Sequence, residues 1–86
     1  MSGKTSYYFT FGCDSPNRDI YVRVTVPYPC ECAVAYEEAR GMFMARYGSD
    51  WAMQYTDAEV ESHRGKEWFL KKSIVDFEDM PPWHSN

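Results

Sequence analysis

The feature of this sequence that most restricts its fold is a change in the spacing of its apolar residues near residue 30. Residues 7–11 and Ile20–Val26 place apolar side chains at every second position, which is typical of β-strands with one buried face. Over Ala33–Tyr47 the apolar residues instead follow the 3.6-residue period of an α-helix. Pro27 and Pro29 lie between the two patterns and cannot donate hydrogen bonds to a neighbouring strand. We therefore expect a pair of strands followed by one main helix.

The segments around this helix extend the pattern. Residues 12–19 are rich in turn-forming residues and suit a loop between two antiparallel strands. Residues 51–56 alternate again, which predicts a short third strand in the centre of the sheet. Thr56 and Glu59 have the spacing of a capping box. This spacing predicts a second, short helix that ends near His63.

Residues 68–77 predict a fourth strand, and Lys71 and Lys72 are charges that suit an edge of the sheet. The predicted order is strand, strand, helix, strand, short helix, strand. This order indicates an α+β fold, in which an antiparallel sheet of about four strands carries the main helix on one face. We assign residues 1–80 to a single domain and residues 81–86, which begin with two prolines, to a flexible C-terminal tail.

The two faces of the predicted sheet differ in character. The main helix is expected to cover the face that carries Phe9, Phe11, Val22 and Val24. The other face is expected to be open to solvent and to carry Tyr8, Thr10, Tyr21, Arg23 and Thr25. Tyrosine and arginine are enriched among the residues that dominate binding energy at protein interfaces. The open face is therefore a candidate docking surface.

The charge balance argues against nucleic acid as a direct partner. Nine Lys and Arg against thirteen Asp and Glu give a formal net charge of −4, the wrong sign for a protein that binds phosphates by releasing counterions. The sequence contains no apolar run of the roughly 20 residues that a membrane-spanning helix needs. The first residues also lack the pattern of a secretory signal. We therefore expect a cytoplasmic protein without a membrane partner.

The sequence shows no recognisable catalytic, metal-binding or cofactor-binding motif. Its three cysteines, Cys13, Cys30 and Cys32, are an odd number and are expected to be free thiols. A zinc site that adds His63 can be drawn, but Cys30 and Cys32 are closer in sequence than the paired ligands of structural zinc sites. We predict that the protein is not an enzyme and holds neither a metal nor a cofactor.

Large apolar side chains are more numerous than a small core requires. The chain has seven Tyr, five Phe, three Trp and five Met residues. Aromatic residues and Met are enriched at protein interfaces, where they provide a large and adaptable contact area. The alternative is that a small domain uses large side chains to fill its core. We expect some of these residues to contact a partner, and an exposed edge strand also leaves a homo-oligomer open.

Several short motifs resemble a family of small proteins encoded by bacteriophages and prophages. The motifs are Tyr8-Phe9-Thr10-Phe11-Gly12, Tyr21-Val22, Tyr36-Glu37-Glu38-Ala39-Arg40 with Met44, Tyr47-Gly48, Trp51-Ala52 and Gln54-Tyr55. The resemblance covers residues 7–56 and implies no catalytic residue. It implies an accessory protein that binds and blocks a component of the host cell, commonly a defence system.

We therefore interpret the chain as a non-catalytic inhibitor, for example of the anti-CRISPR type, that binds a host protein or protein complex. The residues expected to contact this partner are Tyr8, Tyr21 and Arg23 on the open face, Asp14, Asn17 and Arg18 in the loop at its end, and Met44 on the helix.

Two other functions stay open. A sponge for a small signalling nucleotide would stack the base on aromatic rings and bind phosphate with Arg18, Arg23 or Arg40, in a pocket completed by a second copy. Nucleic-acid mimicry would instead use acidic side chains in place of phosphates, with Asp57, Glu59, Glu61, Asp76, Glu78 and Asp79 as candidates.

Overall fold

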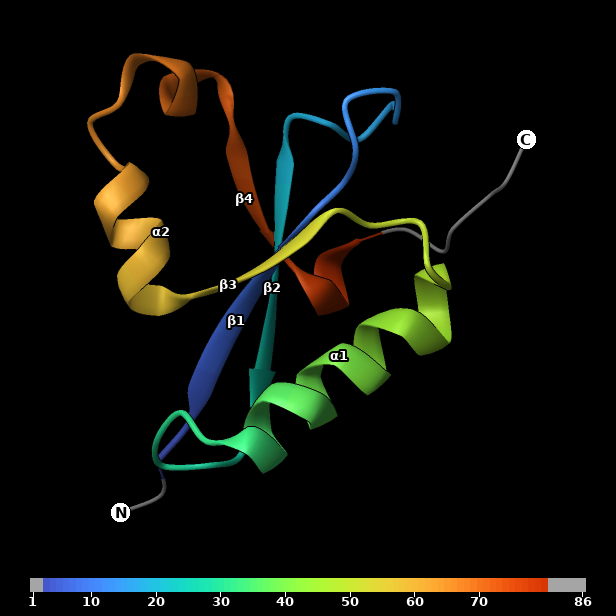
Figure 1. The fold of residues 1–86 in the computed structure, drawn as a ribbon, viewed down its shortest axis with the longest axis vertical. Coiled ribbons are helices and arrows are strands. Elements are labelled where there is room, and N and C mark those ends of the chain that lie inside the picture. The colour runs from blue at the N-terminus through green and yellow to red at the C-terminus, as the bar shows by residue number, and fades with distance from the viewer. Residues whose placement is uncertain (1–2, 81–86) are drawn as a thin grey trace.

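An antiparallel pair of strands forms the centre of the sheet, as the alternation predicts. The computed structural model describes residues 3–80 of the chain (Figure 1). Strand β1 (Thr5–Thr10) pairs with β2 (Ile20–Val26), and the register places Tyr8 opposite Arg23. The strand order is β3-β1-β2-β4, so both of these strands have a neighbour on each side.

Strand β3 (Met53–Thr56) lies at an edge of the sheet, so the prediction of a central third strand is wrong. It pairs antiparallel with β1, with Tyr55 opposite Tyr8. The alternation of apolar residues reports that a strand has one buried face. It carries no information on how many strands lie beside it, which is why the position of β3 could not be predicted.

Strand β4 (Ser73–Asp76) lies at the opposite edge, as predicted, but it is shorter than predicted and runs parallel to β2. Residues Glu67–Lys71 form a 3-10 helix, η1, in place of the first part of the predicted strand. A second 3-10 helix, η2 (Phe77–Asp79), follows β4. The sheet is therefore mixed rather than antiparallel, within the predicted α+β class.

The parallel orientation of β4 follows from the path of the chain. Strands β3 and β4 point the same way and are separated by β1 and β2, so the chain must cross one face of the sheet to connect them. Helix α2 (Asp57–His63) and η1 make this crossing (Figure 1).

Helix α1 (Ala33–Tyr47) covers the face that the sequence predicts (Figure 1). Phe43 of α1 stacks on Phe9 of β1 with ring centroids 4.4 Å apart. The main core is formed by the buried side chains of α1 and the first sheet face, which are Tyr7, Phe9, Phe11, Val22, Val24, Val26, Ala35, Ala39, Phe43 and Tyr47, together with Met80.

A polar clasp joins α1 to the edge strand β3. Arg40 Nε donates to Gln54 Oε1 at 3.0 Å, and Gln54 Nε2 donates to the carbonyl oxygen of Tyr36 at 3.0 Å. The Arg40 guanidinium carbon also lies 5.0 Å from the ring centroids of Tyr36 and Trp51, a cation–π geometry. Gln54 is buried, and these bonds give both ends of its amide a partner. The clasp therefore holds an edge strand against the helix without leaving the buried amide unsatisfied.

The second face of the sheet is also covered, which the sequence did not predict. Val60 of α2 and Phe69 of η1 pack on Tyr8 and Tyr21 and form a second, smaller core. The Phe69 ring meets the Tyr21 ring edge-on with centroids 5.1 Å apart. The expectation of an open face is therefore wrong over its central part.

Capping residues close to each helix in sequence determine where α2 begins and where α1 ends. Thr56 Oγ1 accepts a hydrogen bond from Glu59 N at 3.2 Å, and Glu59 Oε1 accepts one from Thr56 N at 2.8 Å. The predicted capping box at the start of α2 is thus confirmed. Gly48 ends α1 with a φ of 66° and a ψ of −140°, a combination that glycine adopts without the steric cost that a side chain would add.

Gly41→Ala is expected to raise the free energy of unfolding by about 1 kcal/mol, because alanine favours the helix and restricts the unfolded chain. Gly41 lies inside α1, and a Cβ built there meets no atom within 4 Å. Gly48→Ala is the matched control and is expected to destabilise the protein by about 1 kcal/mol through left-handed strain. Urea denaturation measures both changes. A loss of stability in Gly41→Ala would show that α1 needs a glycine at this position.

Phe69→Ala is expected to lower the free energy of unfolding by about 3 kcal/mol, because it leaves a cavity in the second core. Leu70→Ala, at the adjacent exposed position, is the control and is expected to change stability by less than about 0.5 kcal/mol. Thermal and urea unfolding compare the two variants. Equal effects would mean that η1 is not anchored through Phe69.

Candidate functional site

Tyr8 and Tyr21, two of the residues predicted to form the docking face, lie on the same side of the sheet but are buried. Each is only 3% exposed. The Tyr8 hydroxyl donates to Asp57 Oδ1 at 2.8 Å, and the Tyr21 hydroxyl lies 3.3 Å from His63 Nδ1. Burial raises the pKa of both hydroxyls, with a further contribution from Asp57 at Tyr8 and from Tyr55 at Tyr21. The premise that these two tyrosines are exposed is therefore wrong, and in this fold they are core residues.

Arg23, the third predicted residue of this face, reaches the surface beside β4. Its Nε donates to Asp76 Oδ1 at 2.6 Å, and the two side chains are 38% and 45% exposed. This hydrogen bond raises the pKa of the Arg23 guanidinium and lowers the pKa of the Asp76 carboxyl. Because Asp76 neutralises the charge of Arg23, a partner would meet an ion pair with no net charge at this position.

The predicted loop residues are at the surface, at the end of the sheet where β1 leads into β2. Buried Ser15 organises this loop: its Oγ accepts from Asn17 N at 3.1 Å, and its carbonyl oxygen accepts from Arg18 Nη1 at 3.3 Å. Asp14 and Arg18 are exposed, and Asn17 is half-buried. The loop is accessible, but the structure does not join it to the buried tyrosines in one docking face.

The three cysteines are not brought together. Cys13 lies in the loop after β1, whereas Cys30 and Cys32 follow β2, and antiparallel pairing places these two loops at opposite ends of the sheet (Figure 1). All three thiols are free and exposed. Among the residues that the structure describes, no three His, Cys, Asp or Glu side chains lie close enough to hold a metal ion. The four-residue zinc site drawn from the sequence is therefore not assembled there.

The arginines considered for a nucleotide pocket lie on different parts of the fold. Arg18 belongs to the loop after β1, and Arg23 lies on the α2 side of the sheet. Arg40 lies on the α1 side and contacts Gln54 and Tyr36. A single chain therefore does not direct these three side chains at one phosphate group.

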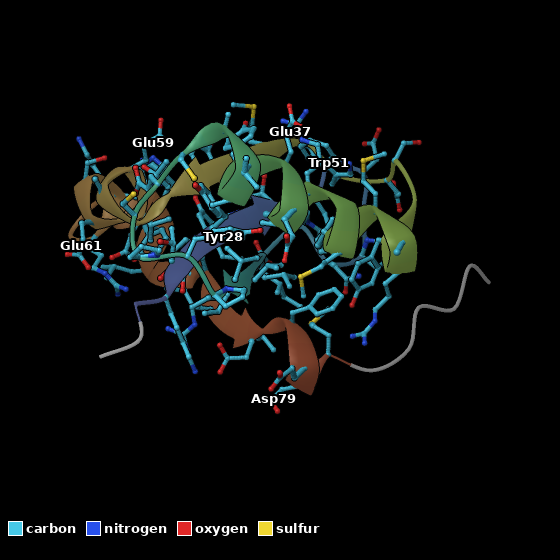
Figure 2. All side chains as sticks on the ribbon, turned by 90° about the horizontal axis from the view of Figure 1, so that it is seen from below. Tyr28, Glu37, Trp51, Glu59, Glu61 and Asp79 are labelled. Atoms are coloured by element: carbon cyan, nitrogen blue, oxygen red, sulfur yellow. The ribbon has the colours of Figure 1, made fainter. Side chains whose placement is uncertain are left out.

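The acidic residues considered as phosphate mimics are also dispersed. Figure 2 shows Glu59 and Glu61 on α2 well apart from Asp79. Glu59 caps α2, and Glu61 Oε2 accepts from Arg64 Nε at 2.8 Å. Asp76 pairs with Arg23. Much of this negative charge is thus engaged within the chain.

The remaining predicted residue, Met44, lies on the outer side of α1, which is apolar in the second half of the helix. The exposed residues on this side are Val34, Gly41, Met42, Met44 and Ala45, together with Glu37 and Glu38 in the first half. At 100° per residue, Met42 and Met44 fall on the two borders of this side. Gly41 and Ala45 lie between them in the second half of the helix, and Val34, Glu37 and Glu38 lie between them in the first half. A shallow hollow of about 460 Å³, lined by Met42, Ala45, Arg46 and Phe77, adjoins it. A helix with apolar residues on both sides is typical of one that packs on two neighbours.

Sequence reasoning identified Met44 but missed Val34 and Met42. For Val34 the signal was present, because this side chain falls outside the stripe of Ala35, Ala39 and Phe43 that packs on the sheet. Such a residue is expected on the surface once the direction of the stripe is known. Helical spacing instead assigns Met42 to that stripe, and the structure corrects this, because Met42 is 38% exposed.

Sequence reasoning also missed a second apolar surface on η1. Trp68 and Leu70 are 50% and 74% exposed, whereas Phe69 between them is 7% exposed. The alternating exposure matches the predicted strand, but the backbone is a 3-10 helix. Only the tertiary structure decides that Phe69, rather than its two neighbours, faces the core.

No protein-family model, curated protein or solved structure matches this chain. None of the helices described between residues 3 and 80 has the length and apolar character needed to cross a membrane. Function therefore has to be inferred from the surfaces themselves.

The Arg23–Asp76 pair is expected to make stability depend on pH at the acid end. Folding lowers the pKa of Asp76 below its ordinary value of 3.8. A lowered pKa in the folded state stabilises the protein above the unfolded value, and this contribution is lost as the pH falls through the folded value. Asp76→Asn should therefore reduce the loss of stability below about pH 4. Asp79→Asn is the control, and urea denaturation across a pH series would refute the role of Asp76 if both variants behaved alike.

Proposed function

We propose that this protein is a non-catalytic binding protein that attaches to another protein through the outer side of α1. The proposal keeps the predicted phage-type inhibitor and moves its contact surface from the sheet to the helix. The observation that supports it is the apolar outer side of the second half of a helix whose inner side already supplies the main core.

The exposed side chains are of the types that protein interfaces use. Val34 is 59% exposed, and Met42 and Met44 are 38% and 39% exposed. Methionine has a flexible, polarisable side chain that adapts to different partner surfaces. Removing these side chains from water on binding would be favourable, because the gain scales with the apolar area that is covered.

The small residues between the two methionines define the shape of the surface. Gly41 and Ala45 are exposed and lie on the outward direction of α1, so a partner backbone can approach the helix closely there. The neighbouring hollow beside Phe77 offers room for one apolar side chain of the partner. A helix or loop of the partner that lies between Met42 and Met44 would fit this surface.

Charge at one end of the surface gives the complex an orientation. Glu37 and Glu38 are exposed in the first half of α1, and Glu38 Oε1 accepts a hydrogen bond from the Tyr28 hydroxyl at 2.7 Å. We therefore expect the partner to place a basic side chain near these carboxylates. This attraction would raise the association rate and fix the orientation of the complex more than it would raise the affinity. By occupying its target in this way, the protein would act as a stoichiometric blocker in the cytoplasm of a host cell.

The test begins with the tagged protein, which is used to capture partners from a bacterial lysate. The affinity of the tagged protein for each captured partner is then measured. Met42→Ala combined with Met44→Ala is expected to weaken binding by about tenfold or more, because a few large side chains contribute most of the energy of an interface. Met53→Ala combined with Leu70→Ala is the matched control, since both residues are exposed elsewhere on the surface.

Loss of affinity in the α1 variant with an unchanged control would support the assignment of the surface. Equal affinity of the native protein and the α1 variant would show that a different surface makes the contact. A native protein that captures no partner would contradict the binding function itself.

A further inference from the structure

A second surface of the protein combines exposed apolar side chains with unpaired positive charge. We name it the Trp68 corner, and it consists of Lys66, Trp68, Leu70 and Lys71. It lies on η1, on the side of the sheet opposite α1 (Figure 1). Leu70 has the largest exposed fraction of any large apolar residue described, at 74%.

The corner is held in a fixed shape by the residue at its centre. Phe69 is buried against Tyr21, and its backbone N donates to the Lys66 carbonyl at 3.0 Å. The Trp68 ring packs near His63 with centroids 5.2 Å apart. Because a 3-10 helix has three residues per turn, Trp68 and Leu70 project from its axis in directions that differ from that of Phe69 and from each other. The two apolar side chains therefore project as a wedge from an anchored segment that needs no folding step before it binds.

The charge around the wedge is opposite to that of the rest of the chain. Residues 61–72 contain four basic and two acidic side chains, whereas the remaining residues carry a formal charge of −6. Lys66 and Lys71 are exposed and take part in none of the ion pairs found within residues 3–80. Exposed Glu67, between Lys66 and Trp68, offsets part of this positive charge and leaves the corner with a formal charge of +1. The molecule is 39 Å long, and charges are largely screened beyond about 8 Å at physiological salt, so the more distant acidic residues oppose the corner only weakly.

These features fit an anionic lipid surface better than the other anionic partners. Single-stranded nucleic acid is bound by several stacking rings along a basic groove, whereas the corner offers one half-exposed indole beside an aliphatic side chain. At a bilayer, tryptophan favours the headgroup level, leucine gains from contact with acyl chains, and lysine is attracted to lipid phosphates.

We propose that the Trp68 corner docks the protein peripherally on a bilayer that contains anionic phospholipids. Such contact requires no membrane-spanning segment, and the absence of such a segment from the sequence was the reason for predicting no membrane partner. The proposal does not depend on the protein-binding role of α1, because the two surfaces lie on opposite sides of the sheet. Docking would concentrate the protein on the membrane with the outer side of α1 left free.

Co-sedimentation with vesicles tests the proposal. The native protein is mixed with vesicles of phosphatidylcholine alone or with about one third phosphatidylglycerol, at increasing salt. Binding is expected on the anionic vesicles and is expected to weaken as salt rises. Lys66→Gln combined with Lys71→Gln is expected to lower the partition coefficient by about 25-fold, which is about fivefold for each lysine. Leu70→Gln should lower it several-fold through lost apolar contact.

Two controls separate this proposal from the others. Met42→Ala combined with Met44→Ala should leave vesicle binding unchanged, so a failure of the α1 proposal and a failure of this one are distinguishable. Circular dichroism confirms that each variant is folded, which is expected because all of the replaced residues are exposed. A fluorescent oligo-dT strand is the competing probe.

The proposal is overturned if the native protein does not sediment with anionic vesicles. Equal binding to both vesicle types, or binding that the corner variants do not reduce, would also overturn it. Tighter binding to oligo-dT that depends on the same residues would assign the corner to nucleic acid instead.

Discussion

The structure depends on the burial of both faces of strand β1. Tyr7 and Phe9 point toward α1 and are almost fully buried, and Tyr8 between them points the other way and is 3% exposed. A single helix covers only one face of a sheet, so a strand with large apolar residues on both faces needs a second layer. Helix α2 and η1 provide it, and they do so with few residues because Val60 and Phe69 reach the tyrosines directly.

This requirement also determines the path of the last third of the chain. Because α2 and η1 cross the second face, the chain reaches the edge beyond β2, where β4 pairs in the parallel direction. The capping box starts α2 directly after β3, which turns the chain over the face at once. The Arg40–Gln54 clasp secures β3 on the other side. Each edge strand is short, which limits the backbone it exposes for pairing with another chain.

Most of the aromatic residues are buried beneath the elements that cover the two faces of the sheet. This burial favours the explanation that a small domain uses large side chains to fill its core. Eight of the Phe and Tyr side chains are buried in the two cores, namely Tyr7, Tyr8, Phe9, Phe11, Tyr21, Phe43, Tyr47 and Phe69. Between residues 3 and 80, the large apolar residues left at the surface are mainly aliphatic side chains and methionines, with Trp68 as the aromatic exception. Apart from Met53 on β3, these exposed residues lie on the outer side of α1 and on the Trp68 corner. Interaction surfaces are thus indicated by which side chains remain exposed and not by the abundance of aromatic residues.

The sequence by itself determined the elements whose signals are local. The alternation in Ile20–Val26, the helical period of Ala33–Tyr47 and the capping box at Thr56 and Glu59 all correspond to elements of the structure. These signals depend on contacts between residues close in the chain, and the periods differ between a strand and a helix. The resemblance to phage proteins and the inhibitor function stay predictions.

Only the tertiary structure decided which strands lie at the edges, that β4 runs parallel, and that Tyr8 and Tyr21 are covered. A tyrosine on the second face of a strand has the same local pattern whether it meets water or a helix. Its burial depends on α2 and η1, which lie about 50 residues away in sequence, and no short-range period encodes that contact. For the same reason the surface position of Met44 follows from its helical position, whereas the exposure of Trp68 and Leu70 depends on the contact of Phe69 with the second core.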